Sequence, residues 1–142
     1  MRWVTWSFLA RGPDLGLLVL RVGLGLAMVA HGWPKLAGGA IKWTKLGGAM
    51  ASLGVTFAPM AWGLAAAVAE TLGGVLLVLG LATRPAAAAL TFTMFVAFKW
   101  HYDAGEGFGG YSHALEDGIA FLALVLLGPG RYSVDHRFLG GR

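Results

Sequence analysis

The chain has 142 residues, of which 57% are hydrophobic and 13% are charged. A soluble domain carries about 25% charged residues, so this composition indicates an integral membrane protein. The chain contains no cysteine, which excludes disulfides, iron–sulfur clusters and thiol chemistry within it. The net charge of +4 comes from residues at the ends of apolar stretches, which favours membrane lipids with anionic headgroups, and not nucleic acid, as partners.

Four apolar stretches predict an all-α fold, a polytopic membrane four-helix bundle. About 20 residues at 1.5 Å each cross about 30 Å of hydrocarbon, so the first two stretches are long enough and the last two are near the lower limit. No room is left for a separate soluble domain, and residues 1–142 are expected to form a single transmembrane domain. The predicted spans are residues 15–33, 59–81, 85–100 and 112–127.

Two connections are more than plain loops. Residues 37–58 are predicted to contain a short interfacial helix between spans one and two, because apolar residues recur there at helical spacing. Gly47 and Gly48 weaken that segment as a regular helix. Residues 101–113 are polar and rich in glycine, and we expect them to cover the mouth of the bundle. The apolar stripe of the short helix consists of Trp43, Leu46, Met50 and Leu53.

Basic residues near the spans predict the orientation, because the cytoplasmic flanks of membrane proteins carry an excess of Lys and Arg. Six such residues flank the side that holds both termini, against four on the other side, so both termini are predicted to be cytoplasmic. The six are Arg2, Arg11, Arg84, Arg131, Arg137 and Arg142, and the four are Lys35, Lys42, Lys45 and Lys99.

Glu70 is the only ionisable residue in the apolar run 59–83, and such a residue near the centre of a span predicts a functional site. Its helical neighbours are mostly small, which lets another helix approach, so Glu70 is expected to face a helix or a cavity. Those neighbours are Gly63, Ala66, Ala67, Gly73, Gly74 and Leu77.

Arg21 is a second buried charge, in the first span, on a stripe that also carries Asp14 and Lys35. Counted from the inner ends of their spans, Arg21 and Glu70 differ in depth by about 7 Å, so the two side chains can reach each other. Asp14 is the competing partner for Arg21, in which case Glu70 needs a donor elsewhere. A structural ion pair that fixes helix register is as consistent with these charges as a catalytic role.

Polar residues also gather toward the outer ends of the spans. Two histidines and one or two carboxylates at one depth can bind a metal or handle the protons of a quinone, although no local metal motif such as H-E-x-x-H is present. The simpler alternatives are an interfacial histidine, acids that meet a helix dipole, and an aromatic belt of tryptophans including Trp33. The outer group consists of His31, His101, His113, Glu116 and Asp117.

Three segments resemble the DoxX family of small four-helix membrane proteins: LRVGLGLAMVAHGWPKL at 20–36, ETLGGVLLVLGLATRPAAAAL at 70–90 and GPGRYSVD at 128–135. The resemblance implies a four-helix transmembrane bundle. It also implies an association with membrane-bound oxidoreductases, including a small subunit of thiosulfate:quinone oxidoreductase, and with assemblies that support redox homeostasis. The positions that match the family's polar pattern are Arg21, His31, Lys35, Glu70, Arg84 and Glu116.

The leading hypothesis is an inner-membrane subunit of a quinone-linked oxidoreductase or redox-homeostasis complex, in which the bundle binds quinone, quinol or a similar apolar molecule. Any activity is expected to need a partner protein, since the chain has no cysteine to relay electrons. The alternatives are a structural subunit of a larger complex, a homo-oligomer, and a small-solute or proton pathway. A haem between His31 and His101 is a minor option, and no metal site is assigned. The predicted catalytic residues are Glu70, His31, His101 and Glu116, and the predicted cofactor-binding residues are Arg21, Glu70 and Trp33.

Overall fold

A computed structural model describes residues 12–139, and within this range every regular element is helical. Arg2, Arg11 and Arg142, which enter the charge count above, lie outside the described residues. In chain order the helices are α1 (Pro13–Leu36), α2 (Gly39–Gly47), the 3₁₀ helix η2 (Gly48–Leu53), α3 (Pro59–Leu79), α4 (Thr83–Asp103), α5 (Gly107–Leu127) and α6 (Val134–Leu139).

Each predicted span coincides with a long helix, and proline or glycine marks several boundaries. Pro13 and Pro59 occupy the first helical positions of α1 and α3. A backbone N–H at this position would have no hydrogen-bond partner within the helix, so proline is tolerated there. Gly80 ends α3 in a left-handed conformation at φ 68°, which glycine adopts without steric cost. The prediction of a short helix between the first two spans is confirmed by α2, and its glycine pair marks the change from α to 3₁₀ geometry.

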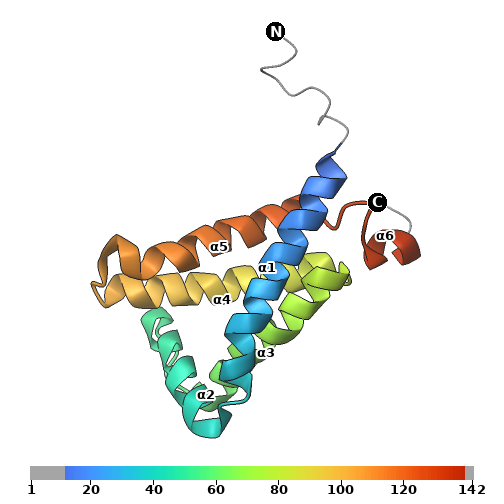
Figure 1. Ribbon diagram of the computed structural model, residues 1–142. Helices are drawn as coiled ribbons and strands as arrows, with labels where there is room; N and C mark the ends of the chain where they lie inside the picture. The colour runs from blue at the N-terminus through green and yellow to red at the C-terminus, as the bar shows by residue number, and fades with distance from the viewer. Residues whose placement is uncertain (1–11, 140–142) are drawn as a thin grey trace.

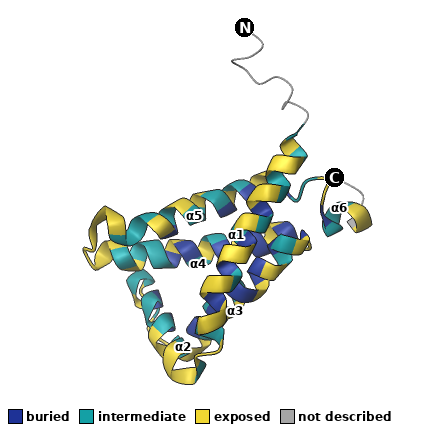
Figure 2. Ribbon diagram, viewed as in Figure 1, coloured by how far each residue is buried: buried dark blue, intermediate teal, exposed yellow. Residues whose placement is uncertain are grey.

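The long helices pack as two pairs. α1 lies against α3, and α5 lies against α4, while α3 and α4 join the pairs through the short link between them. The pairs converge near α6 and diverge toward the opposite end, where α2 and η2 lie (Figure 1). Buried residues line the contacts between helices, and the outer helix faces are exposed (Figure 2).

Glycines make the contact between α1 and α3 close. A Cβ at Gly25 would lie 2.7 Å from the carbonyl oxygen of Gly74, and one at Gly74 would lie 2.6 Å from that of Gly25. Gly32 meets Thr71 in the same way. Without a hydrophobic effect between helices in lipid, such approach supplies the van der Waals contact that holds membrane helices together. The predicted burial of the small-residue faces around Arg21 and Glu70 is therefore confirmed.

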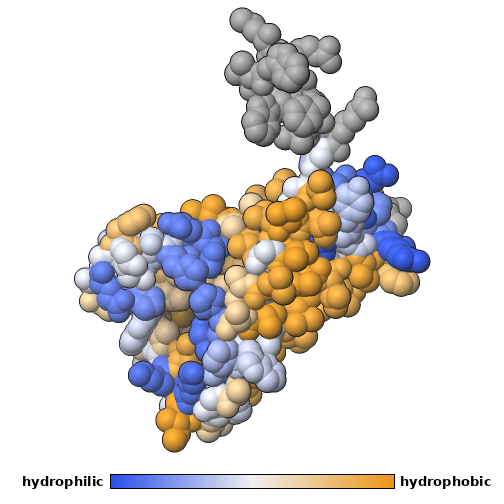
Figure 3. Space-filling model, viewed as in Figure 1, coloured by the Kyte–Doolittle hydropathy of each residue, from blue (hydrophilic) through white to orange (hydrophobic). Residues whose placement is uncertain are grey.

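Among residues 12–139, three helices, α1, α3 and α5, are long and apolar enough to cross a membrane. α4 has the same length as α3 and α5, 21 residues, but it is less apolar. Arg84 lies near its start, and Lys99, His101 and Asp103 lie near its end. On the surface, apolar residues gather over the middle of α1 and α3. Hydrophilic residues gather at the end with α2 and at the end with α6 (Figure 3).

The segment 101–113 differs from its prediction as a covering connection. α4 continues to Asp103 and α5 begins at Gly107, so only residues 104–106 form the link. His101 therefore lies in the last turn of α4, and His113 lies within α5. The bend at Gly105, with φ 71°, is sharp enough to join two antiparallel helices with three residues.

Candidate functional site

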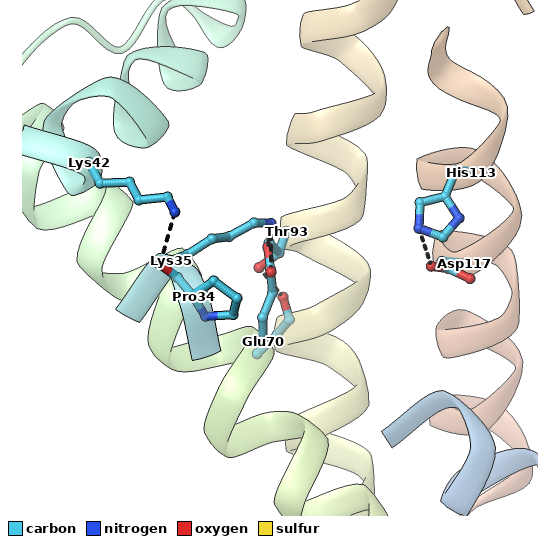
Figure 4. Close-up of polar contacts among 8 residues, drawn as sticks. Pro34, Lys35, Lys42, Glu70, Thr93, His113 and Asp117 are labelled. Atoms are coloured by element: carbon cyan, nitrogen blue, oxygen red, sulfur yellow. Dashed lines mark hydrogen bonds and ion pairs between the residues drawn. The ribbon is translucent and has the colours of Figure 1, made fainter. Parts of the chain in front are cut away.

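Glu70 lies in the middle of α3 with 2% of its surface exposed, and its partner is Lys35 near the end of α1. The Lys35 ammonium lies 2.7 Å and 2.6 Å from the two carboxylate oxygens, so it donates to both. Figure 4 shows the Lys35 side chain reaching across to Glu70 beside Thr93 of α4. A buried carboxylate thus gains a charge-assisted partner, which offsets its desolvation.

An ion pair between Arg21 and Glu70, one of the two pairings that the sequence left open for Arg21, does not form, and helix register explains why. Gly32 of α1 lies against Glu70 and Thr71, whereas Arg21 lies beside Leu77. Seven residues of α3 separate Glu70 from Leu77, which is about 10 Å along the helix. The gap of about 7 Å estimated from the predicted span ends is smaller than this offset, which is why the two side chains are expected from the sequence to be within reach of each other.

Arg21 instead belongs to a second polar site at the opposite end of the molecule. Its guanidinium donates to the backbone carbonyls of Leu77, at 3.0 Å, and Tyr132, at 2.5 Å. Asp14, the other expected partner of Arg21, accepts from the backbone N–H of Arg131 at 2.9 Å. Arg21 is 1% exposed, so it ties the segment after α5 to α1 and α3 from within the fold.

Asp135 completes this inner polar site. Its two carboxylate oxygens accept hydrogen bonds from the backbone N–H groups of Ala82 and Thr83, at 2.7 Å and 2.8 Å, where α4 begins. Burial alone would raise the pKa of Asp135, but these N–H donors and the nearby Arg21 charge hold its pKa below the ordinary value. The carboxylate therefore caps α4, while Arg21 Nε and the Thr83 hydroxyl are buried without a hydrogen-bond partner in the described structure.

A cavity of about 740 Å³, here called the inter-pair cavity, lies where the two helix pairs diverge. Its size falls within the range of sites that hold small molecules. Lys35 and Glu70 lie on its wall together with His31, His101 and His113. Most of the remaining lining is apolar and comes from α1, α2, η2, α3, α4 and α5, including Met28, Met50, Trp62, Phe92 and Trp100.

The three histidines of the cavity come from different helices. The rings of His31 on α1 and His113 on α5 have centroids 5.4 Å apart and so bridge the two helix pairs. His113 lies 3.4 Å from Asp117, and His101 Nδ1 lies 2.7 Å from Glu106. Each of these two rings thus has a carboxylate that can orient it and accept a proton, the arrangement that general acid–base chemistry uses.

Other predicted site residues lie apart from the inter-pair cavity. Trp33 is 62% exposed on α1, and Glu116 is exposed on α5, so neither lines the cavity. Arg21 lies at the inner polar site, as described above. Within residues 12–139, no group of three or more His, Asp or Glu side chains is arranged to hold a metal ion.

The partner that sequence reasoning missed is Lys35, although it was placed on the buried stripe of α1 with Gly32. Had the glycine contacts of α1 been used to set the register, Gly32 opposite Glu70 would have placed Lys35 within reach. The cavity itself had no sequence signal, because it arises from the divergence of two helix pairs.

An apolar core separates the inner polar site from the inter-pair cavity. The core packs buried residues of α1, α3, α4 and α5 around Leu77, Leu90, Phe121 and Leu124, with Met28 at its edge beside the cavity. The polar groups of the inner site and those of the inter-pair cavity are therefore separated by apolar packing.

Comparison with known proteins gives relatives over nearly the whole chain. The DoxX family model matches residues 16–103. Inner membrane protein YphA of Escherichia coli is 34% identical, covering 93% of this chain and 96% of its own, and inner membrane protein YqjF of the same organism is 30% identical, covering 86% and 91%. A protein of Haemophilus influenzae described only as uncharacterized is 33% identical, covering 86% and 90%. No solved structure gives a significant match.

Proposed function

Because this chain belongs to the DoxX family and is a multi-pass protein of the inner membrane, we propose that it is an integral subunit of a quinone-linked oxidoreductase or redox-homeostasis complex. In this proposal the inter-pair cavity binds quinone, quinol or a similar apolar molecule. The electron-transfer partner is a separate protein, since the chain has no cysteine and its described residues form no metal-binding group.

The buried Lys35–Glu70 pair on the wall of an apolar cavity carries the proposal. A quinone headgroup presents carbonyl oxygens that accept hydrogen bonds, and the cavity wall is rich in donors. Lys35, His31 and His113 are the candidate donors, and the indole N–H of Trp62 is buried with no partner in the described structure. Unpaired buried donors are costly, so a ligand that supplies acceptors fits this wall.

A bound quinone would supply the redox chemistry, as a carrier of electrons and protons. The residues of the chain hold and move the protons. Glu70 and Lys35 form an acid–base pair next to the ligand, and His113, backed by Asp117, offers a second proton-handling group on the other helix pair. The apolar walls exclude water from the headgroup.

The proposed topology has four spans, with α4 crossing the membrane as the partner of α5 and both termini in the cytoplasm. α4 packs along α5 and is as long, which supports a fourth crossing. In that arrangement the inter-pair cavity lies toward the outer side and the inner polar site toward the cytoplasm.

The test of the redox proposal is the quinone content and activity of the Glu70→Gln variant. After mild detergent extraction, the wild-type protein should retain quinone, and Glu70→Gln should lose both that quinone and quinone-dependent activity in native membranes. Glu116→Gln is the matched control, because Glu116 is an exposed carboxylate outside the cavity. A wild-type protein without quinone, with Glu70→Gln membranes fully active, would falsify the proposal.

A structural subunit is the second candidate, because the Lys35–Glu70 pair also clasps α1 to α3 where their glycines meet. A scaffold needs this clasp but no ligand. Deletion of the chain should then cause a larger membrane complex to dissociate on native gels, and Glu70→Gln should lower the amount of intact complex. Intact complexes after deletion would rule this candidate out.

A further inference from the structure

The lining of the inter-pair cavity carries an excess of positive charge. Lys35, Lys42 and Lys45 lie on it, and Glu70 is its one acidic residue, which Lys35 already neutralises. The sequence has no Asp or Glu between Lys35 and Glu70. In the described structure neither Lys42 nor Lys45 has an acidic partner, so two positive charges at the cavity remain uncompensated.

Lys42 and Lys45 are held at fixed positions by the packing of α2. They are three residues apart and so share one face of this helix. α2 touches α3 backbone to backbone, since a Cβ at Gly47 would overlap the carbonyl of Pro59. The indole N–H of Trp43 also donates to the carbonyl of Lys35 at 3.1 Å, which ties α2 to the end of α1.

Both lysines have hydrogen-bonding capacity left for a ligand. The Lys42 ammonium donates to the carbonyl of Pro34 at 2.9 Å, which uses one of its three N–H groups (Figure 4). Both lysines are exposed. Beside them the wall turns apolar, at Met50, Trp62 and Phe92. The cavity thus joins a cationic rim to an apolar interior, and the unpartnered N–H of Trp62 adds a donor within that interior.

We propose that the inter-pair cavity binds an anionic phospholipid, with the headgroup phosphate at Lys42 and Lys45 and an acyl chain along the apolar wall. A phosphate supplies the negative charge and the acceptor oxygens that the rim lacks. A free phosphate would leave the apolar wall empty, whereas a lipid fills both parts. The phosphate site uses Lys42 and Lys45 and not the Lys35–Glu70 pair, so lipid binding does not require the proposed redox function, although the acyl chain would occupy the same apolar wall as the proposed quinone.

The test measures lipid binding to the delipidated protein by native mass spectrometry in mild detergent. Phosphatidylglycerol and phosphatidylcholine with identical acyl chains are compared, because they differ in net charge. The wild-type protein should prefer phosphatidylglycerol, and Lys42→Gln/Lys45→Gln should weaken phosphatidylglycerol binding by about 30-fold. Excess inorganic phosphate should not displace the lipid.

Matched variants separate this site from other effects. Lys99→Gln removes an exposed lysine outside the cavity and should leave binding unchanged, and Lys42→Arg/Lys45→Arg keeps the charge and should keep the preference. Glu70→Gln should also bind phosphatidylglycerol normally, whatever its effect on quinone. Equal binding of the two lipids by the wild-type protein, an unchanged preference in Lys42→Gln/Lys45→Gln, or displacement by inorganic phosphate would overturn the proposal. If the double Gln variant does not fold, raising the salt concentration on the wild-type protein must weaken phosphatidylglycerol binding, and its failure to do so overturns the proposal equally.

Discussion

At the scale of residues, the two buried charges among the described residues have different partners and different surroundings. Glu70 meets a cation on the wall of a cavity, whereas Arg21 meets backbone carbonyls in a closed site. The sequence was sufficient to show that both side chains face inward, because each lies on a stripe of small residues. Their partners depend on how far α1 slides along α3, which no local pattern specifies.

Replacing Lys35 tests the ion pair. Lys35→Met leaves the Glu70 carboxylate buried without a partner, and we expect the free energy of unfolding to fall by about 2 kcal/mol, less than for a fully buried pair because Lys35 is 31% exposed. Thermal unfolding in mild detergent measures this. Lys99→Met is the control, since its pair with Asp103 is exposed and should contribute under about 0.5 kcal/mol. Lys35→Met/Glu70→Gln should recover part of the loss.

The lowered pKa of Asp135 predicts that the stability of the protein depends on pH. Its pKa is lowered in the folded protein, so its contribution is present above the ordinary value of 3.8 and is lost as the pH falls through the lower folded-state value. Asp135→Asn should lower stability by about 1 kcal/mol at pH 7, because only one acceptor oxygen remains for the start of α4. Unfolding measured from pH 7 to about pH 2 should show the stabilities of the wild type and the variant converging at the acid end. If the stabilities of the wild type and Asp135→Asn keep a constant difference across this pH range, the prediction is wrong. Asp103→Asn, at an exposed carboxylate, is the control.

At the scale of elements, glycines decide which helices pair. α1 carries glycines on two faces, and those that face α3 leave no room for a side chain, whereas Gly23 has open space around it. Sequence alone identified the small-residue face of α3 and the break in α2 at Gly47. It did not show that Gly47 is also the point where α2 touches α3, because that contact depends on how the chain folds back between Gly47 and Pro59, which no local pattern specifies.

Two alanine substitutions on α1 separate packing from helix propensity. Gly25→Ala places a methyl group 2.7 Å from the Gly74 carbonyl oxygen, so we expect α1 and α3 to be forced apart and stability to fall by about 1–3 kcal/mol. Gly23→Ala should instead raise stability by about 0.5 kcal/mol, since it meets no atom and removes backbone freedom. Thermal unfolding of both variants provides the comparison, and equal effects would contradict the close contact.

At the scale of the whole molecule, the polar groups at the two ends differ in kind. The end with α6 is closed by Arg21 and Asp135, and the end with α2 holds the inter-pair cavity with its histidines and lysines. In the proposed function, this asymmetry would let a ligand enter from one side of the membrane only. The difference between the two ends arises because the helix pairs diverge away from the short link between α3 and α4.

Cysteine labelling tests the four-span topology directly, because the chain has no cysteine of its own. Ala104 and Arg137 are exposed, at the α4–α5 link and in α6. With four spans and cytoplasmic termini, a membrane-impermeant thiol reagent on intact cells should label Ala104→Cys and should label Arg137→Cys only after lysis. If α4 does not cross the membrane, the pattern reverses.

The sequence by itself determined the membrane class, the positions of the four long helices, the short helix before α3 and the inward faces of Arg21 and Glu70. These follow from composition and helical period, which are local properties of the chain. Only the tertiary structure decided that Lys35 pairs with Glu70, that Arg21 holds the segment after α5, and that a cavity opens between two helix pairs. Those features depend on the register and divergence of helices, which are set by close contacts between glycines distant in sequence.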